Sequence, residues 1–214
     1  MADEHQRWHR RQLMDRAAVA LEKNGFTARL FDDREAAVSY LIEATEGSSS
    51  VGFGGSMTLA QLQLPELVAG QGKETLVHGR PGLSDEERLQ IMREQLTCDL
   101  FMTSTNALTL GGHLVNIDGN GNRVCAMAFG PKKVVVVAGA NKIASDDAAA
   151  LKRVKEVACP PNARRLGFRT PCATTGVCAD CDAEQRICRI TTIIERCPRP
   201  TPIEICLINE NLGY

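Results

Sequence analysis

Aromatic residues are scarce in this chain, and no stretch of it is apolar for long enough to span a bilayer. Phe, Trp and Tyr make up 4% of its 214 residues, which leaves few rings on which the bases of single-stranded nucleic acid could stack. Lys and Arg number 25 and Asp and Glu 26, so the whole protein carries no field that attracts a polyanion. We therefore expect neither a nucleic-acid-binding function nor a membrane span.

A secretory signal and a full set of disulfides are also not expected. The first residues, MADEHQRWHRR, are charged and lack the apolar core of a signal peptide. Nine cysteines are an odd number, which does not suit a fully paired disulfide framework. Clustered thiols in such a chain are typical of metal or redox chemistry in a reducing compartment. We therefore expect a cytoplasmic protein.

The order of helix and strand patterns predicts the fold class. Hydrophobic residues make up 43% of the chain, enough to bury a sizeable core. The apolar run Val134–Val137, between Pro131 and Gly139, is typical of a strand that is covered on both faces. Because such strands alternate with helical patterns, we expect an α/β fold with an open, mostly parallel sheet and helices on both faces.

The expected organisation is a helix over residues 1–24 followed by one α/β domain over 25–214. A cysteine-rich, metal-binding loop over 163–190 is inserted before the last strands. We take homodimerisation through the first helix as a further hypothesis.

Turn and proline signals predict three local boundaries. A break is expected before Pro65, and the helix that follows Ser145 is expected to end at Cys159, which two prolines follow. The turn over 118–122 is expected to join strands over 114–117 and 124–129 as a hairpin.

Four cysteines near the carboxyl end have the spacing C-x5-C-x2-C-x6-C. Four thiolates suit either a tetrahedral zinc ion or a [4Fe–4S] cluster. Zinc modules usually show two C-x2-C pairs and this segment has one, so the spacing favours the cluster. Buried or disulfide-bonded cysteines without metal are the third alternative. The predicted ligands are Cys172, Cys178, Cys181 and Cys188.

The other cysteines carry weaker signals. Cys98 and Cys125 fall in helix or strand contexts, and we expect both to be small core residues. Cys159 and Cys197 lie at the ends of elements and are candidates to replace one of the four ligands.

A glycine-rich segment, residues 52–58, lies between a predicted strand and a predicted helix. Glycines let the backbone approach a ligand, and the helix N-terminus offers unpaired N–H groups, so the segment suits a carboxylate or a phosphate. It has neither the Gly-Lys-Ser/Thr of a Walker A loop nor a dinucleotide fingerprint. A tight turn with a serine cap also explains it. The candidate anion-binding residues here are Gly54, Gly55, Ser56 and Thr58.

A second polar stretch follows in the middle of the chain. Arg123 can fork onto a carboxylate, Asp118 can act as a base or a metal ligand, and Lys142 follows the buried strand into the same crevice. Turn chemistry alone also accounts for residues 118–122. The candidates are Asn106, Asn116, Asp118, Arg123 and Lys142; the sequence contains no nucleophile elbow, serine–histidine–acid arrangement or HExxH motif.

Several segments, taken in order, resemble a known family: GFGGSMTL (52–59), TNALT (105–109), GHLVNIDG (112–119), GNRV (121–124), VVVVA (134–138), RTPC (169–172) and ENLG (210–213). The resemblance is to the lactate-utilisation (LUD) domain family. It implies an open α/β sheet like that of the sugar-phosphate isomerase and coenzyme A transferase superfamily. Ligand sites would then lie at strand ends near the glycine-rich turn.

The resemblance implies an accessory or electron-transfer protein of L-lactate or hydroxyacid utilisation. It would carry an iron–sulfur cluster, bind a small organic acid or a phosphorylated ligand, and act with a redox protein. The chain lacks the tandem ferredoxin motifs of the family's iron–sulfur subunit and the glutamate of a coenzyme A transferase motif. Two alternatives stay open: an enzyme acting on a small carboxylate or phosphate ester, and a non-catalytic module stapled by zinc.

Overall fold

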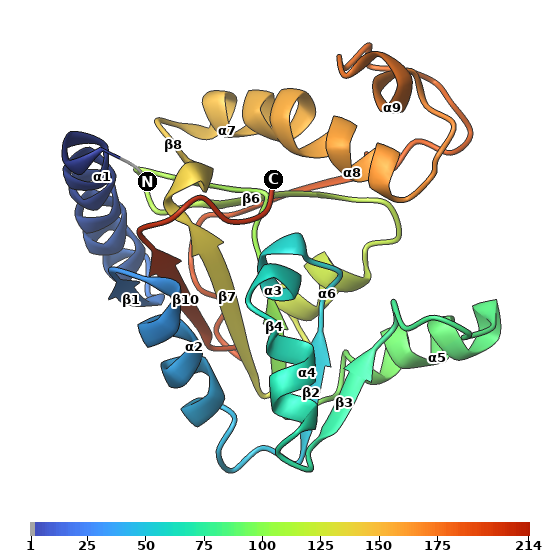
Figure 1. The fold of residues 1–214 in the computed structure, drawn as a ribbon, viewed down its shortest axis with the longest axis horizontal. Coiled ribbons are helices and arrows are strands. Elements are labelled where there is room, and N and C mark those ends of the chain that lie inside the picture. The colour runs from blue at the N-terminus through green and yellow to red at the C-terminus, as the bar shows by residue number, and fades with distance from the viewer. Residues whose placement is uncertain (1–2) are drawn as a thin grey trace.

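The computed structural model describes residues 3–214, and its centre is a six-stranded sheet in which every pairing is parallel. The strand order is β1-β10-β7-β4-β2-β3, and helices flank the sheet (Figure 1). Within these residues no helix combines the length and apolarity needed to cross a membrane. The strands are β1 (Thr27–Phe31), β2 (Ser50–Phe53), β3 (Glu74–Val77), β4 (Leu100–Thr103), β7 (Lys133–Gly139) and β10 (Ile203–Ile208).

Alternate residues of β7 pack against helices on opposite faces of the sheet. Val134 and Val136 share a core with α1 and α6, whereas Val135 and Val137 share another with α2, α3 and α4. Since successive side chains of a strand point to opposite faces, both faces are covered, and the predicted α/β architecture is confirmed. The helices are α1 (Glu4–Lys23), α2 (Arg34–Glu43), α3 (Met57–Gln61), α4 (Leu64–Ala69), α5 (Asp85–Glu94) and α6 (Asn122–Ala128).

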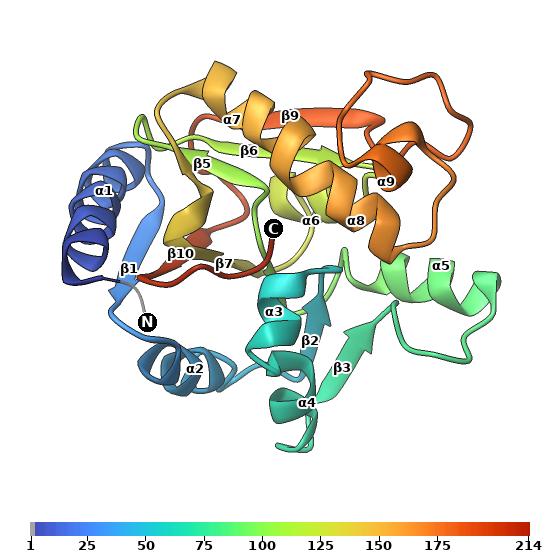
Figure 2. The same ribbon diagram turned by 45° about the horizontal axis from the view of Figure 1, so that its top comes forward.

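A second, four-stranded sheet, in the order β8-β5-β6-β9, forms a further layer that the sequence pattern did not predict. Strand β6 runs antiparallel to both β5 and β9, and in Figure 2 these strands lie beside α7. The elements of this layer are β5 (Ala107–Thr109), β6 (Leu114–Asp118), β8 (Ile143–Ala144), β9 (Ile190–Ile194), α7 (Asp147–Arg153), the π-helical turn Val154–Ala158, α8 (Cys159–Arg165) and α9 (Pro171–Thr175).

The hairpin predicted over 114–129 is wrong, because its second half is the helix α6. Strand β6 already pairs with β5 on one edge and β9 on the other, so a returning strand has no free edge. The carboxylate of Asp118 accepts a hydrogen bond from the Val124 N–H at 3.1 Å, within the first turn of α6. The helix also turns Cys125 to solvent, which corrects its expected place in the core; Cys98 is buried as expected.

The two proline signals have different outcomes. The break before Pro65 is confirmed, because α3 ends at Gln61, Gln63 lies in the left-handed region with φ +54°, and Pro65 is in the first turn of α4. The first turn of α4 leaves its N–H groups unpaired in any case, so Pro65 removes no hydrogen bond. The helix end predicted at Cys159 is wrong: a π-helical turn joins α7 to α8, and the Cys159 N–H donates to the Val154 carbonyl oxygen.

Helix α1 packs into the main core. Met14, Ala17 and Leu21 are fully buried in the same cluster as Phe101 and Val134. The opposite side of α1 leaves Trp8 and Val19 exposed. Homodimerisation through this helix stays a prediction.

The close approach of α1 to a glycine turn is testable. Gly112 has φ +78°, and a Cβ there would lie 2.6 Å from the carbonyl carbon of Ala20. A left-handed residue with a side chain costs about 1–2 kcal/mol, and α1 would also have to shift. We therefore expect Gly112→Ala to lower the free energy of unfolding by about 2 kcal/mol or more in urea denaturation.

The neighbouring Gly111 provides the matched control. A Cβ there meets only the Thr109 Oγ1 at 3.5 Å and the His113 Nε2 at 3.9 Å, so Gly111→Ala should leave stability nearly unchanged. Equal losses in the two variants would contradict the tight packing of α1 on this turn.

Candidate functional site

A cavity of about 510 Å³ lies where β2, β4 and β7 end. The carboxyl ends of parallel strands are where open α/β sheets bind ligands. One wall comes from the segments that follow these strands, and another from α8 and residues 185–189 of the cysteine-rich loop.

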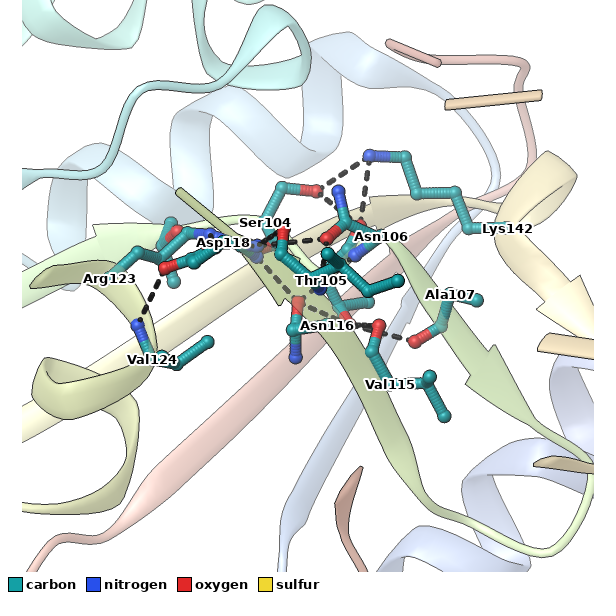
Figure 3. Close-up of polar contacts among 12 residues, drawn as sticks. Ser104, Thr105, Asn106, Ala107, Val115, Asn116, Asp118, Arg123, Val124 and Lys142 are labelled. Atoms are coloured by element: carbon teal, nitrogen blue, oxygen red, sulfur yellow. Dashed lines mark hydrogen bonds and ion pairs between the residues drawn. The ribbon is translucent and has the colours of Figure 1, made fainter. Parts of the chain in front are cut away.

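Lys142, in the 3₁₀ turn that follows β7, is the buried cation of this cavity. Its Nζ donates hydrogen bonds to the Thr58 Oγ1 (2.9 Å), the Ser104 Oγ (2.8 Å) and the Thr105 carbonyl oxygen (3.1 Å). Figure 3 shows the side chain reaching the segment that follows β4. None of these partners is a carboxylate. Burial, together with the nearby charges of Arg153 and Arg123, lowers the pKa of Lys142 to about 7.

The glycine loop, residues 52–58, contributes hydroxyl groups. Ser56 caps α3, its Oγ accepting from the Leu59 N–H at 3.3 Å, and Thr58 is fully buried against Lys142. Gly54 is required by packing, because a Cβ there would lie 2.5 Å from the Thr103 Oγ1 of β4. The loop therefore supports the cavity through side-chain oxygens and close backbone packing.

Arg123, at the start of α6, is the centre of a polar network whose members converge in Figure 3. Its Nε donates to the Asp118 Oδ1 at 3.0 Å, and these side chains are only 11% and 8% exposed. Its remaining N–H groups donate to the Ser104 carbonyl oxygen and to the side-chain oxygens of Asn106 and Asn116. Arg123 is thus engaged with protein oxygens, and its predicted contact with a ligand stays a prediction.

The structure brings the predicted anion-binding residues to one place. Gly54 and Asn116 lie behind the wall, the first against β4 and the second beneath Arg123. The others line the cavity: Gly55, Ser56, Thr58, Asn106, Asp118, Arg123 and Lys142.

The cavity lining is strongly basic, which the sequence did not reveal. Asp118 has the one side-chain carboxylate among the described lining residues, and it is paired with Arg123. The sequence pattern placed Arg186 and Arg189 only beside Cys188. The lining groups that sequence reasoning missed are His78, Arg88, Ser104, Arg165, Arg186 and Arg189.

His78, directly after β3, presents a neutral ring to the glycine loop. The Gln95 side-chain nitrogen lies 3.1 Å from the His78 Nδ1. The two N–H groups of this Gln95 amide donate to the carbonyl oxygens of Phe53 and Leu76, both at 2.8 Å. The His78 Nε2 is the atom nearest to a Cβ built on Gly55. Burial is the main cause that lowers the pKa of His78 below its ordinary value.

The four predicted metal ligands lie on one segment, and their thiols are free and partly buried. Within residues 3–214 no three His, Cys, Asp or Glu side chains form a group that could hold a metal ion in this arrangement. The donor set itself, four free thiols, has the chemistry of a thiolate-bound metal. The ligand assignment stays a prediction.

Two cationic side chains contact the cysteine segment, residues 172–188, which carries the four predicted metal ligands. Arg186 donates to the carbonyl oxygens of Cys181 (2.7 Å) and Cys188 (3.1 Å), and Lys155 pairs with Asp180 at 2.9 Å. Cys188 packs against the small core that contains the buried Cys159, and burial raises the pKa of the Cys159 thiol to about 12. Because Arg186 also lines the cavity, the cysteine segment and the basic cavity share a wall.

Fold and site together define an α/β protein with a basic cavity at the carboxyl edge of a parallel sheet. Residues 14–208 match the LUD domain, so the chain belongs to the LUD domain family, which confirms the resemblance. The fold is similar to the crystal structure of a DUF162 family protein from Deinococcus radiodurans (TM-score 0.55, 13% identity, 93% of this chain and 98% of the other). Ribose 5-phosphate isomerase A from Neisseria gonorrhoeae is a partial match (TM-score 0.33, 15% identity, 53% and 54%). A comparison with curated proteins finds no match.

The buried Arg123–Asp118 pair yields a stability prediction. In Asp118→Asn the Arg123 charge stays buried without its counter-ion, and breaking a buried pair in this way costs about 3–5 kcal/mol. We expect a loss of this size in urea denaturation. Asp15→Asn, which removes the exposed pair with Arg11, is the control and should cost less than about 1 kcal/mol. Similar small losses in the free energy of unfolding of both variants would show that the buried pair does not stabilise the fold.

Proposed function

We propose that the protein binds a small organic acid or a phosphorylated ligand in the basic cavity. We further propose that it serves L-lactate or hydroxyacid utilisation as an accessory or electron-transfer protein. The observation that carries the binding function is Lys142, a buried ammonium with hydroxyl and carbonyl partners and no paired carboxylate among the described residues. Burying an unpaired charge costs free energy, which a bound anion offsets. Membership of the LUD domain family supports the metabolic role.

Two hydroxyl groups beside Lys142 can donate further hydrogen bonds to a bound anion. The oxygens of Thr58 and Ser104 accept hydrogen bonds from the ammonium, so their own protons remain available. In the structure these hydroxyl groups make long contacts. Thr58 contacts the Leu212 carbonyl at 3.4 Å, and Ser104 contacts the Thr105 carbonyl at 3.3 Å and the Thr58 Oγ1 at 3.4 Å. An anion at ordinary hydrogen-bond distance would be the better acceptor for both.

The electron-transfer part of the proposal rests on the cysteines. Cys172, Cys178, Cys181 and Cys188 would hold a [4Fe–4S] cluster, which supplies one-electron transfer when bound, and a redox protein would be its partner. Zinc held by the same thiolates is the alternative, in which the metal only staples the loop. Free thiols and nearby cations support either metal.

A second candidate function is an enzyme acting on a small carboxylate or phosphate ester. It is favoured by Lys142, because an amine with a pKa of about 7 can give and take a proton near neutral pH. Asp118 suits the role of base less well, since its carboxylate oxygens bind Arg123 and the Val124 N–H. Turnover of an organic acid by the isolated protein, retained after cysteine substitution, would support this candidate.

Anion affinity is expected to fall as pH rises through about 7, where Lys142 loses its charge. Calorimetric titration with L-lactate, which stays ionised throughout, should show binding weakening by about tenfold or more from pH 6 to pH 8.5. Burial lowers the pKa of His78 from its ordinary value, so His78 loses its proton at lower pH than Lys142. The unfolded state keeps the lysine proton that the folded state releases, so Lys142 should make the free protein more stable from pH 7 to about pH 8. Above about pH 8.5 the buried thiols of Cys98, Cys159 and Cys206, whose pKa values are raised by burial, oppose this rise.

Lys142→Met should abolish both pH dependences, because it removes the titrating group. Lys152→Met, which changes an exposed lysine on α7, is the matched control and should keep them. Lactate binding that is independent of pH in the unmodified protein would contradict the role of Lys142.

Metal binding is tested by Cys178→Ser and Cys181→Ser. Each removes one predicted thiolate, so anaerobically purified variants should lose iron and sulfide, or zinc, and hydrogen exchange should quicken over 163–190. Cys125→Ser, which changes an exposed thiol on α6, should leave both unchanged. Full metal content in the double variant would refute the ligand assignment.

A further inference from the structure

The cationic groups of the cavity occur in two separate places. Lys142 donates to Ser104, whose carbonyl accepts from Arg123 at 2.8 Å. Arg123 is neutralised by Asp118, and the Asp118 carbonyl oxygen accepts from the backbone N–H of Arg189 at 3.0 Å. This series of contacts leads from one unpaired cation, past a neutral ion pair, to a second group of cations. We call this second group, Arg88, Arg165, Arg186 and Arg189, the outer arginines.

The sheet sets the separation between the two places. Lys142 follows β7, whereas Arg88 lies on α5, the helix that follows β3, and β4 and β2 lie between those strands. Neighbouring strands are about 4.8 Å apart, so the ends of β7 and β3 are separated by about 14 Å. The long side chains of Lys142 and Arg88 shorten the distance between their charges.

Arg88 has an unsatisfied donor at this second place. Its Nε is buried and has no hydrogen-bond partner within the described part of the chain, while its Nη2 makes one long contact with the Leu83 carbonyl at 3.4 Å. A buried donor without an acceptor is unfavourable, and a guanidinium matches the oxygens of a phosphate. His78 lines the same cavity.

From this arrangement we infer that the ligand is a phosphorylated carboxylic acid, with its carboxylate at Lys142 and its phosphate at the outer arginines. The two ends of the ligand are assigned by charge. Lys142 offers one cation, which matches a monoanion. Arg88, Arg165 and Arg189 have no carboxylate partner among the described residues and match a phosphate dianion, whereas Arg186 also contacts the Asp180 carboxylate at 3.7 Å. The inference rests on the proposed anion-binding function and narrows it to ligands with two separated anionic groups.

The size of the cavity agrees with this class. Its volume of about 510 Å³ lies within the range of about 300–1,000 Å³ that is typical of ligand sites, and a three-carbon acid would fill only a small part of it. The lining also includes the side-chain amides of Asn120, Asn122 and Gln185. These amides suit the hydroxyl groups of a sugar-acid chain.

Calorimetry on the full chain at pH 6.5 and low salt tests the inference with two matched trios. The first is 6-phosphogluconate, gluconate and glucose 6-phosphate; the second, with a shorter carbon chain, is 3-phosphoglycerate, glycerate and glycerol 3-phosphate. In at least one trio the doubly anionic compound should bind tenfold or more tightly than either singly functional compound.

Two substitutions test whether the carboxylate of the ligand lies at Lys142 and its phosphate at the outer arginines. Lys142→Met should remove the advantage of the doubly anionic compound over the phosphate-only compound, and Arg88→Gln should reduce its advantage over the carboxylate-only compound. Arg93→Gln changes an exposed arginine of the same helix that lies outside the cavity and should alter neither. Thermal unfolding checks each variant, and Arg88→Gln is expected to remain folded because it removes an unpaired donor.

The outcomes separate the inference from the proposed function. If singly functional compounds bind as tightly as the doubly anionic ones in both trios, the inference is overturned and the anion site stands. If none of the six compounds binds, both fail. An advantage that survives Lys142→Met and Arg88→Gln together would overturn the assignment of the ends.

Discussion

The buried ammonium of Lys142 joins the segments that form the basic cavity, because these segments meet at one nitrogen atom. Thr58 comes from the segment after β2, and Ser104 and Thr105 from the segment after β4. A Cβ built on Gly213 would lie 3.3 Å from the Nζ and 2.5 Å from the Thr58 Oγ1, so the segment after β10 also closes on it. A single buried cation thus fixes the edge of the sheet where four strands end.

The second constraint is the ion pair between Arg123 and Asp118, in which the carboxylate neutralises the guanidinium in the cavity wall. Its partners include the side-chain oxygens of Asn106 and Asn116. Because Asp118 neutralises Arg123 and Asp180 contacts Arg186, the remaining positive charge of the described lining comes from Lys142, Arg88, Arg165 and Arg189. The site therefore combines a rigid neutral centre with cationic ends.

The cysteine segment is structurally tied to this site. Arg186 binds the carbonyl oxygens of Cys181 and Cys188 and also lines the cavity. Ordering of the cysteines by a metal would fix the position of that guanidinium. The two features that the sequence showed as separate motifs, the cysteine spacing and the polar residues of the anion crevice, therefore belong to one structural unit.

Local sequence patterns determined much of the fold. The apolar run Val134–Val137 predicted a strand covered on both faces, and the candidates from the glycine loop to Lys142 did converge on one cavity. Tertiary structure alone decided that 122–128 is helical, because β9, from far along the chain, takes the edge of β6. It also brought Arg88 and Arg165 to the cavity. The spacing of residues within a short segment predicts neither the helix over 122–128 nor the place of these arginines at the cavity. Both depend on contacts between residues far apart in the chain.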